Sequence, residues 1–130
     1  MLVTLVTGGL SGLLYFWLSW RVVQVRQSTK VSIGHGDDDL LLQRIRAHAN
    51  FAEYVPICLI LLALVEDSYE IAPTGLWLAG LALIVVRIAH AIGMVRENGN
   101  PFRVVGAAGT WVVMVALSLW ALETAYVLLS

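Results

Sequence analysis

Residues 73–95 read PTGLWLAGLALIVVRIAHAIGMV, an apolar run in which Arg87 and His90 are the only ionisable side chains. A helix over these residues rises about 34 Å at roughly 1.5 Å per residue. That length crosses a hydrocarbon core of about 30 Å. We therefore expect a transmembrane helix here and a lipid bilayer around the chain.

The composition of the whole chain supports that expectation. Of its 130 residues, 59% are hydrophobic and 13% are charged, outside the range of soluble domains. A net charge of −1 argues against nucleic acid as a partner. The apolar runs are too long and continuous for barrel strands. The sequence predicts an all-α membrane protein, one domain over residues 1–130 whose four transmembrane helices form a bundle at about 2–25, 40–65, 73–95 and 102–128.

The helix at 40–65 is the least obvious of the four. Its uncharged part, residues 54–65, is too short to span a bilayer alone, and its first half carries four ionisable side chains. We accept it because the topology requires it. Basic residues gather around the first and third loops and acidic ones in the second, so the positive-inside rule predicts both termini on the non-cytoplasmic side.

Two polar stripes lie inside these predicted helices. In the second helix, Gln43, Arg46, Asn50 and Glu53 are spaced by 3, 4 and 3 residues, so they share one helix face. In the third, Arg87, His90 and Met94 share a face for the same reason, and both stripes fall in the cytoplasmic half. An ionised group at this depth costs at least about 2.5 kcal/mol and normally has a partner. Our hypothesis is that Glu53 pairs with Arg87.

The stripes have two interpretations. The polar groups either hold the helices together or form a site for a small anion, open to the cytoplasm. We favour the anion site, because more polar groups converge than a helix contact needs. Four arginines, at positions 26, 46, 87 and 103, favour a carboxylate or a thiolate as the ligand.

Two other features have structural interpretations. In the loop at residues 34–39 we expect aspartates to cap the second helix rather than to bind a metal, so the sequence predicts no metal site. Gly8 and Gly12 form a small-xxx-small pair, and Gly106 and Gly109 thin one face of the fourth helix. Both glycine pairs permit close helix packing.

Residues 46–56, RAHANFAEYVP, resemble the second-helix signature of the MAPEG family, the membrane-associated proteins in eicosanoid and glutathione metabolism. Residues 87–90, RIAH, resemble the third-helix element of that family, and residues 101–103, PFR, resemble the turn into its fourth helix. The resemblance covers the whole chain and is closest to the small bacterial branch. It implies an inner-membrane homotrimer that binds glutathione as co-substrate between subunits, with a lipophilic second substrate arriving from the bilayer.

The resemblance also assigns expected roles to residues. It implies Arg103 as the catalytic residue, whose guanidinium stabilises the glutathione thiolate. The implied glutathione ligands are Arg26, Arg46, Asn50, Glu53, Tyr54, Arg87 and His90.

The chain departs from the prostaglandin synthase branch in several places. Met94 replaces a tyrosine, and Val104 and Ala107 stand where that branch has hydroxyls. These losses argue against a specialised eicosanoid activity. The predicted function is a glutathione-dependent transferase or peroxidase acting on lipophilic electrophiles. The alternative is a non-enzymatic membrane protein whose polar cluster serves assembly or binds another small anion.

Overall fold

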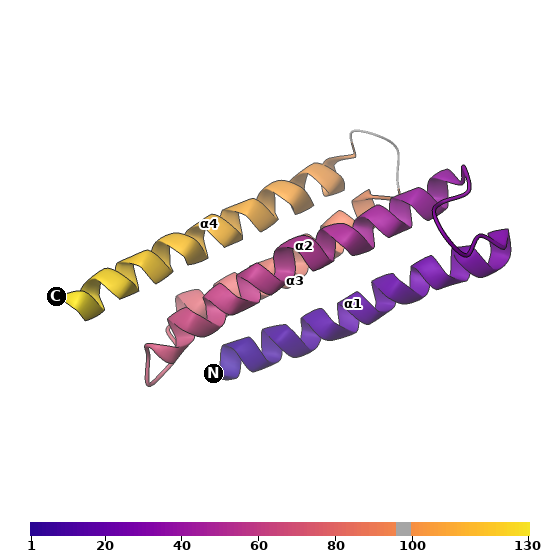
Figure 1. Cartoon of the computed structure of the whole chain (residues 1–130). Coiled ribbons are helices and arrows are strands. Elements are labelled where there is room, and N and C mark those ends of the chain that lie inside the picture. Colours follow the sequence, from indigo (N-terminus) through magenta and orange to yellow (C-terminus); the bar gives the residue numbers. More distant parts are fainter. Residues whose placement is uncertain (96–99) are drawn as a thin grey trace.

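The computed structural model describes residues 1–95 and 100–130. Its four helices are α1 (Leu2–Thr29), α2 (Asp39–Asp67), α3 (Thr74–Gly93) and α4 (Pro101–Leu129). Figure 1 shows them side by side as an elongated bundle, with both chain termini at one end. All four are long and apolar enough to cross a membrane. The predicted four-helix membrane bundle is therefore confirmed.

The two ends of the bundle differ in the segments that they hold. The terminal end holds both termini and the turn 68–73, and the loop end holds the loop 30–38 between α1 and α2. At the loop end Asp38 caps α2, as the sequence predicts: its side chain accepts a hydrogen bond of 2.7 Å from the backbone N–H of Leu41. α1 extends four residues beyond its predicted end at residue 25, to Thr29.

The helices differ in how closely they pack. α3 and α4 make the most extensive contact, α1 packs on α2 and α3, and α1 does not reach α4 within the described residues. A Cβ added at Gly106 would lie 2.5 Å from the His90 Cβ, and one at Gly109 would lie 2.5 Å from a methyl group of Val86. The prediction that these two glycines allow close packing is confirmed. By contrast, a Cβ at Gly8 or Gly12 would meet no atom of another helix within 4 Å, so this pair makes no close helix contact among the described residues.

Glu66 is one of the acidic residues of the predicted second loop, just beyond the predicted helix end at residue 65. It lies within the last turn of α2, is 1% exposed, and accepts hydrogen bonds of 2.8 Å from the backbone N–H groups of Val3 and Thr4. It also accepts a 2.7 Å bond from the Thr4 hydroxyl and pairs with the terminal ammonium at 3.3 Å. The reason is that the first N–H groups of a helix have no partner within the helix and carry a partial positive charge. Glu66 thus fixes the start of α1 to the end of α2.

Near the loop end, α1 and α2 are joined by polar and aromatic contacts. The Ser19 hydroxyl lies 2.9 Å from Nε2 of His48, and the ring of Tyr15 stacks on the His48 ring at 4.5 Å. These contacts give His48 a structural role, since it joins α2 to α1. They also fix the rotation of α2, and therefore which of its polar residues face the core.

Candidate functional site

The centre of the candidate site is the guanidinium group of Arg87, on α3 about 9 Å from the loop end of that helix. Arg87 is 1% exposed. Its Nη1 donates to Asn50 Oδ1 on α2 at 2.9 Å and to Thr110 Oγ1 on α4 at 3.3 Å. One arginine therefore joins three helices in the middle of the bundle.

His90 lies one turn further along α3 on the same face. Its Nδ1 is 3.5 Å from Nη2 of Arg87, and the side chain is 4% exposed. Gly106 of α4 packs directly against it, since any larger residue there would overlap its Cβ. The four residues Asn50, Arg87, His90 and Thr110 together form what we call the polar cluster.

The charge of the polar cluster is not balanced by a carboxylate within the described part of the chain. Asn50 and Thr110 are neutral, and the ion pair found among the described residues lies at the terminal end, at Glu66. Among the described residues, the buried Nε of Arg87 has no hydrogen-bond partner. The Phe51 ring faces the guanidinium, with Cζ of Arg87 5.5 Å from the ring centroid. Such a cation–π contact offsets only part of the cost of a buried charge.

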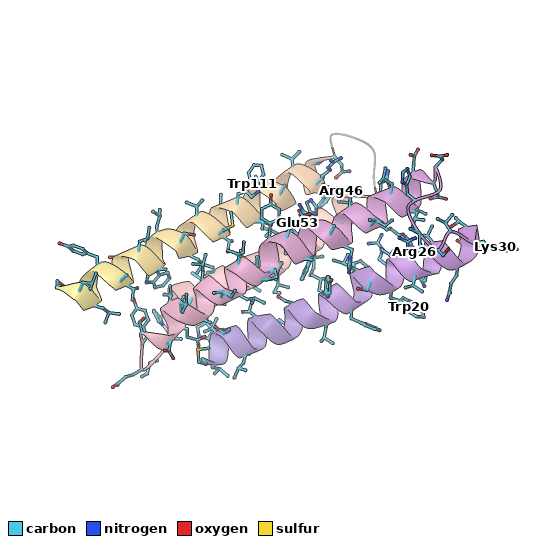
Figure 2. The ribbon with its side chains drawn as sticks, in the orientation of Figure 1. Trp20, Arg26, Lys30, Arg46, Glu53 and Trp111 are labelled. Carbon is cyan, nitrogen blue, oxygen red and sulfur yellow. The ribbon has the colours of Figure 1, made fainter. Side chains whose placement is uncertain are left out.

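The hypothesis that Glu53 pairs with Arg87 is wrong for the single chain, because Asn50 takes that position. At about 100° per residue, Arg46 and Glu53 lie about 40° and 60° from Asn50 around α2, both in the same direction. With Asn50 pointing at Arg87, the other two turn to the surface, and both are exposed. Figure 2 shows Arg46 and Glu53 along α2 in the half of the bundle nearer the loop end.

The remaining predicted ligands lie around the polar cluster at different distances. Tyr54 is half-buried on α2, within electrostatic range of Arg87. Arg103 is exposed at the start of α4, and its charge acts on His90. Arg26 lies apart: its Nη1 donates to the carbonyls of Val31, Ser32 and Gly34 at 3.0–3.2 Å, so in the single chain it holds the loop 30–38.

The structure thus brings three of the eight predicted site residues into direct contact, namely Asn50, Arg87 and His90. The roles of all eight as ligands or catalyst stay predictions. Sequence reasoning missed Thr110 and Phe51. The sequence does contain a signal for Thr110, because it is a hydroxyl one turn after a glycine in an apolar helix, where the hydroxyl can bond to the glycine carbonyl. Here the Thr110 hydroxyl donates to the carbonyl of Gly106 at 2.7 Å. Phe51 had none, because an aromatic residue in an apolar helix is ordinary.

A groove runs beside the polar cluster, between α1 and α2. It encloses about 320 Å³, within the range of small-molecule pockets. Its lining includes Ser11 and Tyr15 of α1 and Phe51 and Pro56 of α2, and it is almost wholly apolar. Two of the lining residues also carry a polar group that lacks its usual partner. The Ser11 hydroxyl is buried without a partner in the described chain, and the missing N–H of Pro56 leaves the carbonyl of Ala52 without its helical donor.

Aromatic rings connect the groove to the polar cluster. Tyr15 stacks on Phe51 with ring centroids 5.6 Å apart, and Phe51 also faces the guanidinium of Arg87. One ring therefore forms part of the groove wall and part of the surroundings of the buried charge. A molecule in the groove would lie next to that charge without touching it.

Comparison with known proteins places this architecture in a family. Residues 4–122 match the sequence profile of the MAPEG family. The inner membrane proteins YecN of Escherichia coli strains K12 and CFT073 are each 32% identical to the chain over 115 residues, covering 85% of it and 86% of YecN. With four apolar helices and a matching profile over nearly its full length, the chain belongs to the MAPEG family.

Proposed function

We propose that the chain is a glutathione-dependent transferase or peroxidase that acts on lipophilic electrophiles in the inner membrane, where its E. coli relatives reside by name. The observation that carries the proposal is the buried guanidinium of Arg87, which has only neutral partners in the described residues. Such a charge in a bilayer costs at least about 2.5 kcal/mol. An anionic ligand offsets that cost, and glutathione is an anion with two carboxylates and an ionisable thiol.

The rest of the ligand set comes from the exposed side of the polar cluster. Arg46 and Glu53 are exposed on a membrane-spanning helix, where lipid contact is unfavourable for both. We propose that a second copy of the chain covers them in a homotrimer and that glutathione binds in that interface. Tyr54 and Arg103 flank the same region, and Arg26 is the proposed glutathione ligand from the loop end of the bundle.

Arg103 is the proposed catalytic residue, since its exposed guanidinium reaches the interface and stabilises the thiolate. In the transferase reaction, the thiolate sulfur attacks an electrophilic carbon and forms a C–S bond. The displaced electron pair leaves with the leaving group or is protonated by solvent. With a hydroperoxide, the thiolate sulfur attacks the terminal peroxide oxygen and the O–O bond breaks, which leaves a sulfenic acid and an alkoxide that takes a proton from solvent to form an alcohol. A second glutathione then converts the sulfenic acid to the disulfide and releases water.

The groove between α1 and α2 suits the lipophilic substrate. It has an aromatic wall at Tyr15 and Phe51 and an almost wholly apolar lining for an apolar body. Its position beside the polar cluster favours a reaction between a membrane-derived molecule and glutathione held by Arg87.

Thermal unfolding of the detergent-purified protein, with and without millimolar glutathione, tests the proposal. A ligand that binds only the folded state raises the midpoint, by about 2.7 kcal/mol of stability at 100 times Kd. We expect this shift in the parent and its loss in Arg46→Ala and Arg103→Ala. Lys30→Ala removes an exposed cation of the loop end and should keep the shift. The absence of a shift in a correctly assembled parent refutes glutathione binding.

The same variants separate the enzyme from the alternative function, a non-enzymatic protein whose polar residues serve assembly. If Arg46 and Glu53 only join subunits, Arg46→Ala and Glu53→Gln dissociate the oligomer, as light scattering would show. If they bind glutathione, the oligomer persists while the shift and the turnover of a model electrophile are lost. Oligomers that dissociate in both variants, without any glutathione shift in the parent, favour the alternative.

A further inference from the structure

A second cluster of cations lies between α1 and α2, separate from the polar cluster. Nη1 of Arg44 on α2 donates to the backbone carbonyl of Arg21 on α1 at 2.8 Å, which anchors the Arg44 side chain to α1 at the level of Arg21. The charge of Arg44 acts directly on Arg21. Both side chains are only half-buried, so both remain accessible from outside the bundle.

These two like charges have few internal partners. The buried Nε of Arg44 has no hydrogen-bond partner within the described residues. No carboxylate of the described residues forms an ion pair with either arginine. The ion pair found among those residues joins Glu66 to the terminal ammonium, at the other end of the bundle. The guanidinium of Arg21 lies over the Trp17 ring, with Cζ 4.6 Å from the centroid, which orients it along the side of α1.

The depth of this pair along the bundle matches the boundary of the hydrocarbon core. From Leu2, the first residue of α1, to Arg21 the helix rises 19 steps, or about 28 Å, against a core of about 30 Å. Trp17 and Trp20 are exposed at this level, and Figure 2 shows Trp20 on the outer side of α1. Exposed tryptophans of this kind lie at the headgroup level of a membrane. The lipid phosphates of that leaflet lie at the same level.

We propose that Arg21 and Arg44 form a binding site for the phosphate group of an anionic phospholipid. A phosphodiester oxygen beside the two half-buried guanidinium groups offsets their repulsion and accepts hydrogen bonds from their accessible N–H groups. Trp17 and Trp20 then contact the glycerol region and the start of the acyl chains. The site uses neither Arg46 nor Arg87, so it stands apart from the proposed glutathione site.

The test is native mass spectrometry of the protein in uncharged detergent, titrated with phosphatidylglycerol or with phosphatidylcholine of the same acyl chains. Each interfacial arginine contributes about a fivefold preference for an anionic lipid, so the pair should give roughly a 25-fold tighter Kd for phosphatidylglycerol. Arg21→Gln and Arg44→Gln should each reduce this preference about fivefold. Arg21→Gln leaves the Arg44 hydrogen bond intact, because that bond goes to a backbone carbonyl.

Matched controls make the assignment specific. Arg44→Lys keeps the charge and should retain most of the preference, while Lys30→Gln removes a cation of the same end and should leave it unchanged. Equal affinity for the two lipids in the parent, or an equal loss in Lys30→Gln, overturns the proposal. Displacement of phosphatidylglycerol by millimolar inorganic phosphate overturns the lipid as the source, and marks a site for free phosphate instead.

Discussion

Replacing Glu66 by glutamine tests how the start of α1 is held. The carboxylate accepts three hydrogen bonds of 2.7–2.8 Å, from the N–H groups of Val3 and Thr4 and from the Thr4 hydroxyl. A glutamine has nearly the same shape but only one acceptor oxygen. Whichever way the amide turns, its NH2 group faces a donor, and the pair with the terminal ammonium at 3.3 Å is lost. We expect Glu66→Gln to lower the free energy of unfolding by about 2–4 kcal/mol, since hydrogen bonds to charged groups contribute about 1.5–3 kcal/mol each.

The assay is reversible unfolding in mixed micelles, with the fraction of denaturing detergent raised stepwise and helicity followed by circular dichroism. Thr4→Val removes one of the three bonds and should cost about 1 kcal/mol, less than Glu66→Gln. Glu70→Gln is the matched control, because Glu70 is an exposed glutamate in the following turn, and it should leave the transition unchanged. If Glu66→Gln unfolds with the parent, or no earlier than Thr4→Val, Glu66 does not fix the start of α1.

Three further predictions concern the packing of the bundle and the polar cluster. Gly106→Ala should destabilise by about 1–3 kcal/mol in the same assay, since the added Cβ meets His90 at 2.5 Å, whereas Gly8→Ala, with no atom within 4 Å, should stabilise by about 0.5–1 kcal/mol. Arg87→Met should keep the fold in circular dichroism, because an apolar side chain often replaces a buried charge at little cost, yet abolish the thermal shift with glutathione. Ser19→Ala should cost about 0.6 kcal/mol through loss of the contact with His48, measured in mixed micelles.

Each of these three predictions has an outcome that contradicts it. Equal effects of the two alanine substitutions would mean that α3 and α4 do not approach closely at Gly106. A glutathione shift that survives in Arg87→Met would remove Arg87 from the ligand set. A Ser19→Ala variant as destabilised as a core truncation would show that Ser19 contributes by packing rather than by its hydroxyl.

The sequence predicts the fold of this protein well because hydrophobic length is a strong signal in lipid. All four helices lie where they are predicted, with ends displaced by a few residues. The largest displacement, at the end of α1, arises because Arg26 bonds to the carbonyls of the following loop and Lys30 ends the helix in a left-handed conformation. Such capping depends on contacts across the loop, which hydropathy does not encode.

The site is predicted less completely than the fold, because spacing identifies a helix face but not the direction in which that face points. The 3, 4, 3 spacing correctly groups Arg46, Asn50 and Glu53 on one side of α2. Which member of the group meets Arg87 depends on the rotation of α2, set by contacts such as His48 with Ser19 and Tyr15. A rotation of about 60° would exchange Asn50 for Glu53 and turn the neutral contact into an ion pair.

That rotation has a consequence for the glutathione site that we propose. With Asn50 rather than Glu53 against Arg87, no carboxylate of the described chain neutralises the buried guanidinium, and Glu53 stays on the surface. A Glu53–Arg87 pair would satisfy both charges inside one chain and leave Arg87 little to offer an anion. The observed arrangement keeps one cation buried and one carboxylate outside. In the site that we propose, the acidic and amino groups of glutathione would satisfy both together. We therefore expect Asn50→Asp to neutralise Arg87 from within the chain and to abolish the thermal shift with glutathione, and a shift that survives in this variant would contradict the proposed role of the unpaired Arg87 charge.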